Sequence, residues 1–220
     1  MNKQLRHIRS SPRLMIGILV LYYIVGMILF LVEGTRAIFS ILTPLSLMMS
    51  FLAVLIYQLS WSPRLVLSFL TVFLAAIFIE IMGVQTGVLF GEYVYGKALG
   101  IKILDTPVMI GLNWLILIYC TSAIINHFFS NRIIRIMFGA GLMVVFDLVL
   151  EYVAPVMDMW SWQTRYPGFR NFLMWFLVAS IFHSLFQWLN LKIENRPARY
   201  LFLIQFLFFS GIALVTALVR

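Results

Sequence analysis

The chain has 220 residues, of which 63% are hydrophobic and 11% are charged, and its mean hydropathy is +1.00. A soluble globular domain is about half apolar and about a quarter charged, so the composition excludes a soluble fold and indicates a chain that lies in a lipid bilayer. The formal net charge is +8, but the basic residues lie at the ends of apolar runs rather than on one face of a domain. We therefore expect membrane lipid, in particular anionic lipid, as a partner and no nucleic acid.

Seven apolar runs are each long enough, at roughly 20 residues, to cross the hydrocarbon core as helices. A β-barrel would instead show alternating polarity along its strands. We therefore predict an all-α polytopic membrane bundle of about seven transmembrane helices, forming one domain over residues 1–220. The predicted spans are Leu14–Val32, Ile38–Leu59, Leu65–Met82, Pro107–Asn126, Ile133–Val153, Asn171–Leu189 and Tyr200–Val219.

The distribution of lysine and arginine over alternate connections predicts the orientation of the chain. Ten lie on the side of the N-terminus and six on the other side, so the positive-inside rule predicts a cytoplasmic N-terminus. The first group is Lys3, Arg6, Arg9, Arg13, Arg64, Arg132, Arg135, Lys192, Arg196 and Arg199; the second is Arg36, Lys97, Lys102, Arg165, Arg170 and Arg220.

Six of the eight carboxylate residues fall in two segments, around the connections between the third and fourth spans and between the fifth and sixth spans. With seven spans, both segments lie on the outer side, so these acids converge on one end of the bundle. They are Glu80, Glu92, Asp105, Asp147, Glu151 and Asp158.

Three of these acids still lie within apolar runs. An ionised carboxylate in hydrocarbon costs about 3 kcal/mol, so Glu80, Asp147 and Glu151 should face the bundle interior, accept hydrogen bonds or hold a proton. Glu80 is expected in the last turn of its helix, and Asp147 and Glu151, four residues apart, on one helix face. A structural role, in which an acid pairs with Arg165, Arg170 or a backbone amide, is equally supported for Glu80. For the other two we favour function, and one acid of the set could then serve as a general acid.

Aromatic residues surround these acids in the sequence. Any single ring is explained by the interfacial belt of membrane proteins, but together with the acids the rings predict a pocket wall whose π faces stabilise a developing cation. The rings are Phe90, Tyr93, Tyr95, Trp160, Trp162, Tyr166, Phe169 and Phe172.

Five glycines space the segment between the third and fourth spans. Glycine permits tight turns and close backbone approach, and irregular backbone near membrane depth is tolerated only when it is buried or lines a cavity. We therefore expect a re-entrant or lid-like loop over the pocket. The glycines are Gly83, Gly87, Gly91, Gly96 and Gly100.

The sequence predicts no metal site. Cys120 is the only cysteine, and neither His127 nor His183 has a second ligand three or four residues away on its helix.

Four stretches follow one another in order: Glu80 followed by GVQTGVLFGEYVYGKALG, then TPVMIGLNW (Thr106–Trp114), FDLVLEYVAPVMDMWSW (Phe146–Trp162) and YPGFRNFLMW (Tyr166–Trp175). In this order and spacing, over residues 78–175, the chain resembles the carotenoid 1,2-hydratase family, which includes the bisanhydrobacterioruberin hydratases. Glu151 stands where the family commonly has aspartate, which keeps the acid. Val88 and Leu89 replace a step that often ends in proline, and this departure concerns the choice of substrate.

The resemblance implies a hydro-lyase type of enzyme in carotenoid biosynthesis. It would add water across the terminal C-1,2 (C-1′,2′) double bond of an acyclic ψ-end and form a tertiary alcohol. No cofactor is implied, because hydration is redox-neutral. The implied partners are an acyclic or monocyclic carotenoid, water and other enzymes of carotenoid biosynthesis, and the implied location is the bacterial inner membrane.

Acid-catalysed hydration assigns roles to the residues above. Asp147 is the first choice as proton donor because it is expected to lie deepest, and Glu80 and Glu151 would polarise and position water. The candidate substrate-binding residues are Tyr93, Trp160 and Trp162 in a cation-facing wall, Phe90, Tyr95 and Trp114 beside it, and Asn171 as a contact for water or hydroxyl.

Two alternatives stay open. A membrane carotene cyclase starts with the same protonation but captures the cation with an internal double bond, so its product has the mass of its substrate. A small transporter or light-driven pump also uses buried acids, but no predicted span contains the lysine that a retinal Schiff base needs, and no internal repeat is evident.

Overall fold

The computed structural model describes residues 11–164 and 166–219 of the chain. Seven helices in this part are long and apolar enough to cross a membrane, which confirms the predicted all-α polytopic bundle. The basic residues Lys3, Arg6, Arg9, Arg165 and Arg220 lie outside the described residues. The helices are α2 (Pro12–Leu31), α3 (Glu33–Leu55), α4 (Pro63–Thr86), α5 (Val108–Phe128), α6 (Arg132–Val153), α7 (Phe169–Trp188) and α8 (Arg196–Val219).

Local sequence signals explain where the helices begin and end. The Ser62 hydroxyl accepts a hydrogen bond from the Leu65 amide at 3.2 Å, and Pro63 is the first residue of α4. The same helix ends at Gly87, whose φ of 64° is the left-handed conformation that glycine adopts without strain. The Asn131 side chain caps the start of α6 by accepting from two backbone amides.

Four helix boundaries differ from the prediction by four residues or more, and one of them is the end of α3, which lies at Leu55 rather than Leu59. α3 begins at Glu33 rather than Ile38, and α8 begins at Arg196 rather than Tyr200. α4 continues past Met82 to Thr86, so Glu80 lies inside the helix and not in its last turn. The hydropathy of a run marks the hydrocarbon region, whereas helical hydrogen bonding continues into the interface, where polar side chains are tolerated.

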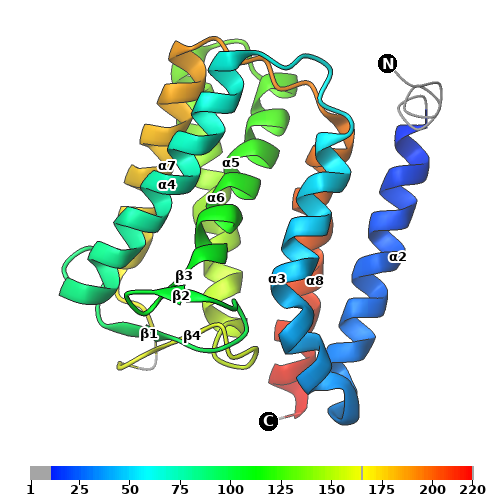
Figure 1. Ribbon diagram of the computed structural model, residues 1–220, viewed down its shortest axis with the longest axis vertical. Coiled ribbons are helices and arrows are strands. Elements are labelled where there is room, and N and C mark those ends of the chain that lie inside the picture. Colours follow the sequence, from blue (N-terminus) through cyan, green and yellow to red (C-terminus); the bar gives the residue numbers. More distant parts are fainter. Residues whose placement is uncertain (1–10, 165, 220) are drawn as a thin grey trace.

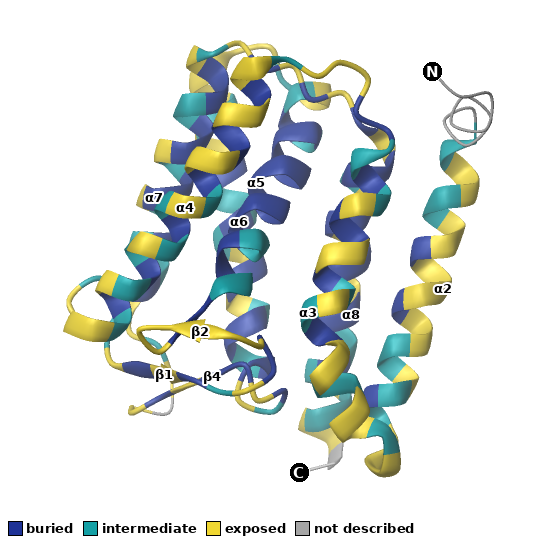
Figure 2. Cartoon of the chain, in the orientation of Figure 1, coloured by how far each residue is buried: buried dark blue, intermediate teal, exposed yellow. Residues whose placement is uncertain are grey.

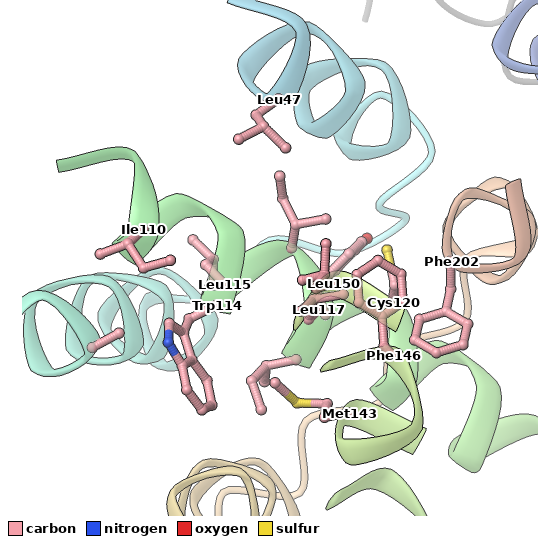
Figure 3. Packing of buried hydrophobic residues seen from close by; sticks show 14 of the residues in the cluster. Leu47, Ile110, Trp114, Leu115, Leu117, Cys120, Met143, Phe146, Leu150 and Phe202 are labelled. Carbon is pink, nitrogen blue, oxygen red and sulfur yellow. The ribbon is translucent and has the colours of Figure 1, made fainter. Parts of the chain in front are cut away.

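α5 forms the centre of the bundle. In its most apolar stretch 72% of the residues are buried, against 17% in α2. Figure 2 shows most of α5 buried, with exposed residues on the outer helices. In Figure 1, α4 to α7 lie together on one side, and α2, α3 and α8 lie on the other. Figure 3 shows part of the core between α5 and α6, which includes Trp114, Leu117, Met143 and Phe146.

Two short antiparallel ribbons cover the ends of α4 to α7 where the acids lie (Figure 1). β1 (Tyr93–Tyr95) pairs with β4 (Trp160–Trp162), and β2 (Lys102–Ile103) pairs with β3 (Thr106–Pro107) through a tight turn at Leu104 and Asp105, both with positive φ. The glycine-rich segment is thus partly strand rather than only an irregular loop. Gly83 belongs to α4 and leaves room for a ring, since a Cβ there would lie 2.6 Å from Phe90 Cδ2.

Candidate active site

Glu80 is a buried carboxyl group with three hydrogen-bond donors. Its Oε2 accepts from the hydroxyls of Tyr93 at 2.6 Å and Tyr95 at 2.8 Å, and its Oε1 accepts from Trp114 Nε1 at 2.9 Å. Both tyrosines come from β1 and the tryptophan from the first turns of α5. Three converging donors suit an ionised carboxylate, because an ionised carboxylate only accepts hydrogen bonds.

Glu151 also receives three donors, from the other strand of the ribbon and from α7. Its Oε2 accepts from Trp160 Nε1 at 3.0 Å and from Trp162 Nε1, and its Oε1 accepts from Asn171 Nδ2 at 3.3 Å. β4 supplies both indoles because residues two apart on a strand face the same side. The register pairs Tyr93 with Trp162 and Tyr95 with Trp160, so the ribbon presents two tyrosines and two tryptophans to the two acids.

Asp147 lies one helical turn before Glu151, as the four-residue spacing predicts, and Asp147 is fully buried. Its Oδ2 accepts from the same Asn171 Nδ2 at 2.9 Å. Its Oδ1 is buried and has no hydrogen-bond partner. Asn171 therefore connects the two acids of α6 through a single amide group.

A small cavity, which we call the acid hollow, separates Glu80 from Glu151. Its volume is about 20 Å³, enough for one water molecule. Asp147 is not among the lining residues and lies behind Asn171. The lining consists of Glu80, Phe90, Tyr93, Tyr95, Ile110, Glu151, Trp160, Trp162, Asn171 and Trp175.

The walls of the acid hollow are aromatic. The rings of Tyr93 and Trp162 lie 4.9 Å apart between centroids, and those of Tyr95 and Trp160 lie 6.1 Å apart in an edge-to-face arrangement. Phe90 packs edge-on against Tyr93 at 6.3 Å. A hollow enclosed by rings and carboxyl groups can hold a positive charge that is shielded from bulk water.

The acids are not paired with cations in the part of the chain that the structure describes. The nearest candidate from the sequence, Arg170, instead donates to the carbonyl oxygen of Gly87 at 2.9 Å. The structural alternative of an Arg170 ion pair is therefore wrong, and the other proposed partner, Arg165, lies outside the described residues. Hydrogen bonds from neutral groups stabilise these carboxyl groups instead.

Of the sequence-predicted residues, eight line the acid hollow and two do not. Trp114 reaches Glu80 through its indole N–H, and Asp147 reaches Glu151 through Asn171. Sequence reasoning missed the lining residues Trp175 and Ile110. Trp175 stacks on Trp114 with centroids 4.3 Å apart, and its position four residues after Asn171 on α7 was the available signal.

The buried histidine, His183, has a hydroxyl group within hydrogen-bonding distance of each of its ring nitrogens. His183 lies fully buried on α7, where Thr121 Oγ1 is 3.1 Å from its Nε2 and Ser122 Oγ is 3.3 Å from its Nδ1. Among the described residues, no group of three or more histidine, cysteine, aspartate or glutamate side chains is arranged to hold a metal ion.

The comparison with known families places the chain in one protein family. A family model described as carotenoid biosynthesis protein matches residues 36–219, well over half of the sequence. The chain belongs to the carotenoid biosynthesis protein family. The match includes every residue of the acid hollow, and the family indicates an enzymatic role in carotenoid biosynthesis for this integral membrane protein. Searches of curated proteins and of solved structures gave no match.

Proposed function

We propose that this member of the carotenoid biosynthesis protein family hydrates the terminal C-1,2 double bond of an acyclic carotenoid ψ-end. One observation carries the proposal: two carboxyl groups, each with three neutral donors, face one aromatic hollow that has room for a water molecule. Water, acid groups and cation-stabilising rings are what Markovnikov hydration of a trisubstituted alkene requires.

The hydrogen bonds support a division of roles among the acids. Glu80 and Glu151 receive donors on both oxygens, which suits carboxylates. Asp147 has one oxygen without a partner, and a neutral carboxyl group would carry its proton there. Asp147 and Glu151, four residues apart on α6 and connected through the Asn171 amide, then form a pair with one proton, which rests on Asp147 and reaches the alkene by way of Glu151. Glu151, on the wall of the acid hollow, is the member of this pair that meets the alkene.

The proposed reaction consumes one water molecule. The acid pair delivers a proton to C-2, the positive charge falls on the more substituted C-1, and the aromatic walls stabilise this tertiary cation. Water held by Glu80 adds to C-1 and releases a proton to the Glu151 carboxylate, which restores the acid pair. A tertiary alcohol results, and all electrons are retained, so the step needs no oxidant or reductant.

The size of the acid hollow constrains how substrate binds. A cavity of about 20 Å³ is smaller than the terminal isoprene unit of a carotenoid. The ψ-end therefore requires a shift of the β1–β4 ribbon or of its rings, a motion of the kind that lids make in other enzymes. The substrate itself stays in the hydrocarbon region, where its polyene is soluble.

Expression in a host that makes an acyclic carotenoid tests the proposal. We expect a pigment whose mass exceeds that of the substrate by one water molecule. A new pigment of unchanged mass would instead support the carotene cyclase alternative, and the absence of any new pigment from an acyclic ψ-end substrate would contradict hydration.

A further inference from the structure

A polar basin lies beside the β1–β4 ribbon, between the end of α4 and β2. Its volume is about 450 Å³. Its charged members Glu92, Lys102 and Asp105 are all exposed, so the basin is open to bulk water. The lining residues are Val84, Gln85, Thr86, Gly87, Glu92, Tyr93, Val94, Tyr95, Lys102, Asp105 and Gln163.

Two residues line both this basin and the acid hollow. Tyr93 and Tyr95 belong to both linings, and both of their hydroxyls donate to the same Glu80 oxygen. Their side chains are only 7% and 8% exposed. Tyr93 and Tyr95 thus lie between the basin and Glu80. Lys102 Nζ donates to the Tyr95 carbonyl oxygen at 2.6 Å and fixes the strand at the rim of the basin.

The two tyrosines remain neutral donors. Burial, with the nearby Glu80 carboxyl adding to it, holds the pKa of both Tyr93 and Tyr95 well above the usual value for a phenol. Both hydroxyls therefore keep their protons at neutral pH and continue to orient Glu80. A neutral hydroxyl can also accept a hydrogen bond from an approaching water molecule.

The proposed hydration needs one water molecule at each turnover, and the surrounding lipid cannot supply it readily. We propose that the basin is the entrance for this water and that Tyr93 and Tyr95 form the passage to Glu80. This inference rests on the proposed hydration. The two substrates then arrive by different routes. The carotenoid comes from the membrane, and water comes through the segments that cover the ends of α4 to α7 (residues 87–107 and 154–168), which we call the cap.

A reversible plug in the basin tests the inference. Cys120, the only cysteine of the chain, is fully buried, so an introduced thiol can be labelled selectively. Gln163→Cys places a thiol on the basin wall at an exposed side chain. Modification with a bulky, membrane-impermeant methanethiosulfonate should lower kcat for hydration at least tenfold and leave KM for the carotenoid unchanged. Reduction of the mixed disulfide should restore the rate.

The control is Ile101→Cys, a position that is 82% exposed on the same cap but outside the basin lining. Labelling there should leave the rate unchanged. Val94→Cys, also on the basin wall, replaces the first variant if that one fails to fold. Labelled basin variants that hydrate at the unlabelled rate would overturn the inference and leave the proposed function standing. A raised KM, or a loss that reduction does not reverse, would also count against a water route. Unlabelled wild-type protein that forms no hydrated product would overturn the proposed function, and the inference with it.

Discussion

Asn171 holds the two acids of α6 in one place. Its Nδ2 lies 2.9 Å from Asp147 Oδ2 and 3.3 Å from Glu151 Oε1, and the residue is only 1% exposed. Under the proposed function the pair holds one proton, because two carboxylates bound to the same amide would repel each other in a medium of low dielectric constant. The amide therefore holds the two acid side chains in position, and its role as a contact for water or hydroxyl stays a prediction.

Asp147→Asn removes the proton of this pair while keeping the shape of the side chain. We expect the variant to insert into the membrane at close to the wild-type level and hydration to fall at least about 100-fold, the scale of a lost general acid. The measurement is the amount of hydrated carotenoid formed per unit of membrane-inserted protein.

Glu33→Gln is the matched control for this change, since it neutralises an exposed carboxyl group at the start of α3. Its turnover should not change. Full turnover in Asp147→Asn would show that Glu151 or Glu80 supplies the proton without Asp147.

The sequence predicted which acids are buried in the bundle better than it predicted which groups bind them. Glu80, Asp147 and Glu151 stood out because a carboxylate in an apolar run is costly. The aromatic residues were predicted as π faces, but Tyr93, Tyr95 and Trp160 also use their polar atoms as hydrogen-bond donors. Residue type alone does not distinguish these uses, because the direction of an O–H or N–H group depends on backbone placement.

At the scale of the elements, α6 and α7 pack against each other over much of their length, and a glycine on α6 leaves room for a side chain of α7. An added Cβ at Gly139 would lie 2.5 Å from His183 Nε2, and the histidine is itself held by Thr121 and Ser122 of α5. Small residues at a helix interface let the backbones approach in membranes. The same two helices carry Asp147, Glu151 and Asn171, so their spacing sets the geometry of the acids.

Gly139→Ala should therefore separate α6 from α7. We expect the melting temperature in detergent to fall by several degrees, consistent with an overpacking cost of about 1–3 kcal/mol, and hydration to fall with it. Gly141→Ala is the control on the same helix, because a Cβ there meets nothing within 4 Å. That variant should be as stable as wild type or slightly more stable, since alanine is the better helix former. Equal melting temperatures for the two variants would contradict this account of the interface.

The strands were harder to predict than the helices. Each transmembrane helix is encoded by a local run of about 20 apolar residues that satisfies its own backbone. β1 and β4 have three residues each and pair Tyr93 with Trp162 across the whole of α5 and α6. Segments this short carry no periodic signal, and their pairing exists only once the helices have brought them together.

At the scale of the whole molecule, the seven helices place the start of α2 and the end of α8 at opposite ends of the bundle (Figure 1). The distribution of basic residues favours a cytoplasmic N-terminus, so the ribbons and the basin should face outward.

Single-cysteine labelling in intact cells measures this orientation. Ile101→Cys, on the cap, should react with an impermeant thiol reagent in intact cells. Ser130→Cys, in the exposed connection between α5 and α6, should react only after the cells are permeabilised. The reverse pattern would mean that the basic residues do not set the orientation and that the acid hollow opens toward the cytoplasm.

The sequence by itself determined that this protein lies in a lipid bilayer and that it has seven helices. It also determined that most of its acids lie at one end of the bundle. These features depend on hydropathy and on the cost of charge in hydrocarbon, and both act over local stretches of chain. Only the tertiary structure decided that Glu80 and Glu151 face one hollow, that Asp147 stands behind Asn171, and that two tyrosines divide this hollow from water. Those facts depend on contacts between residues far apart in the sequence, whose distances are set by helix packing and strand register.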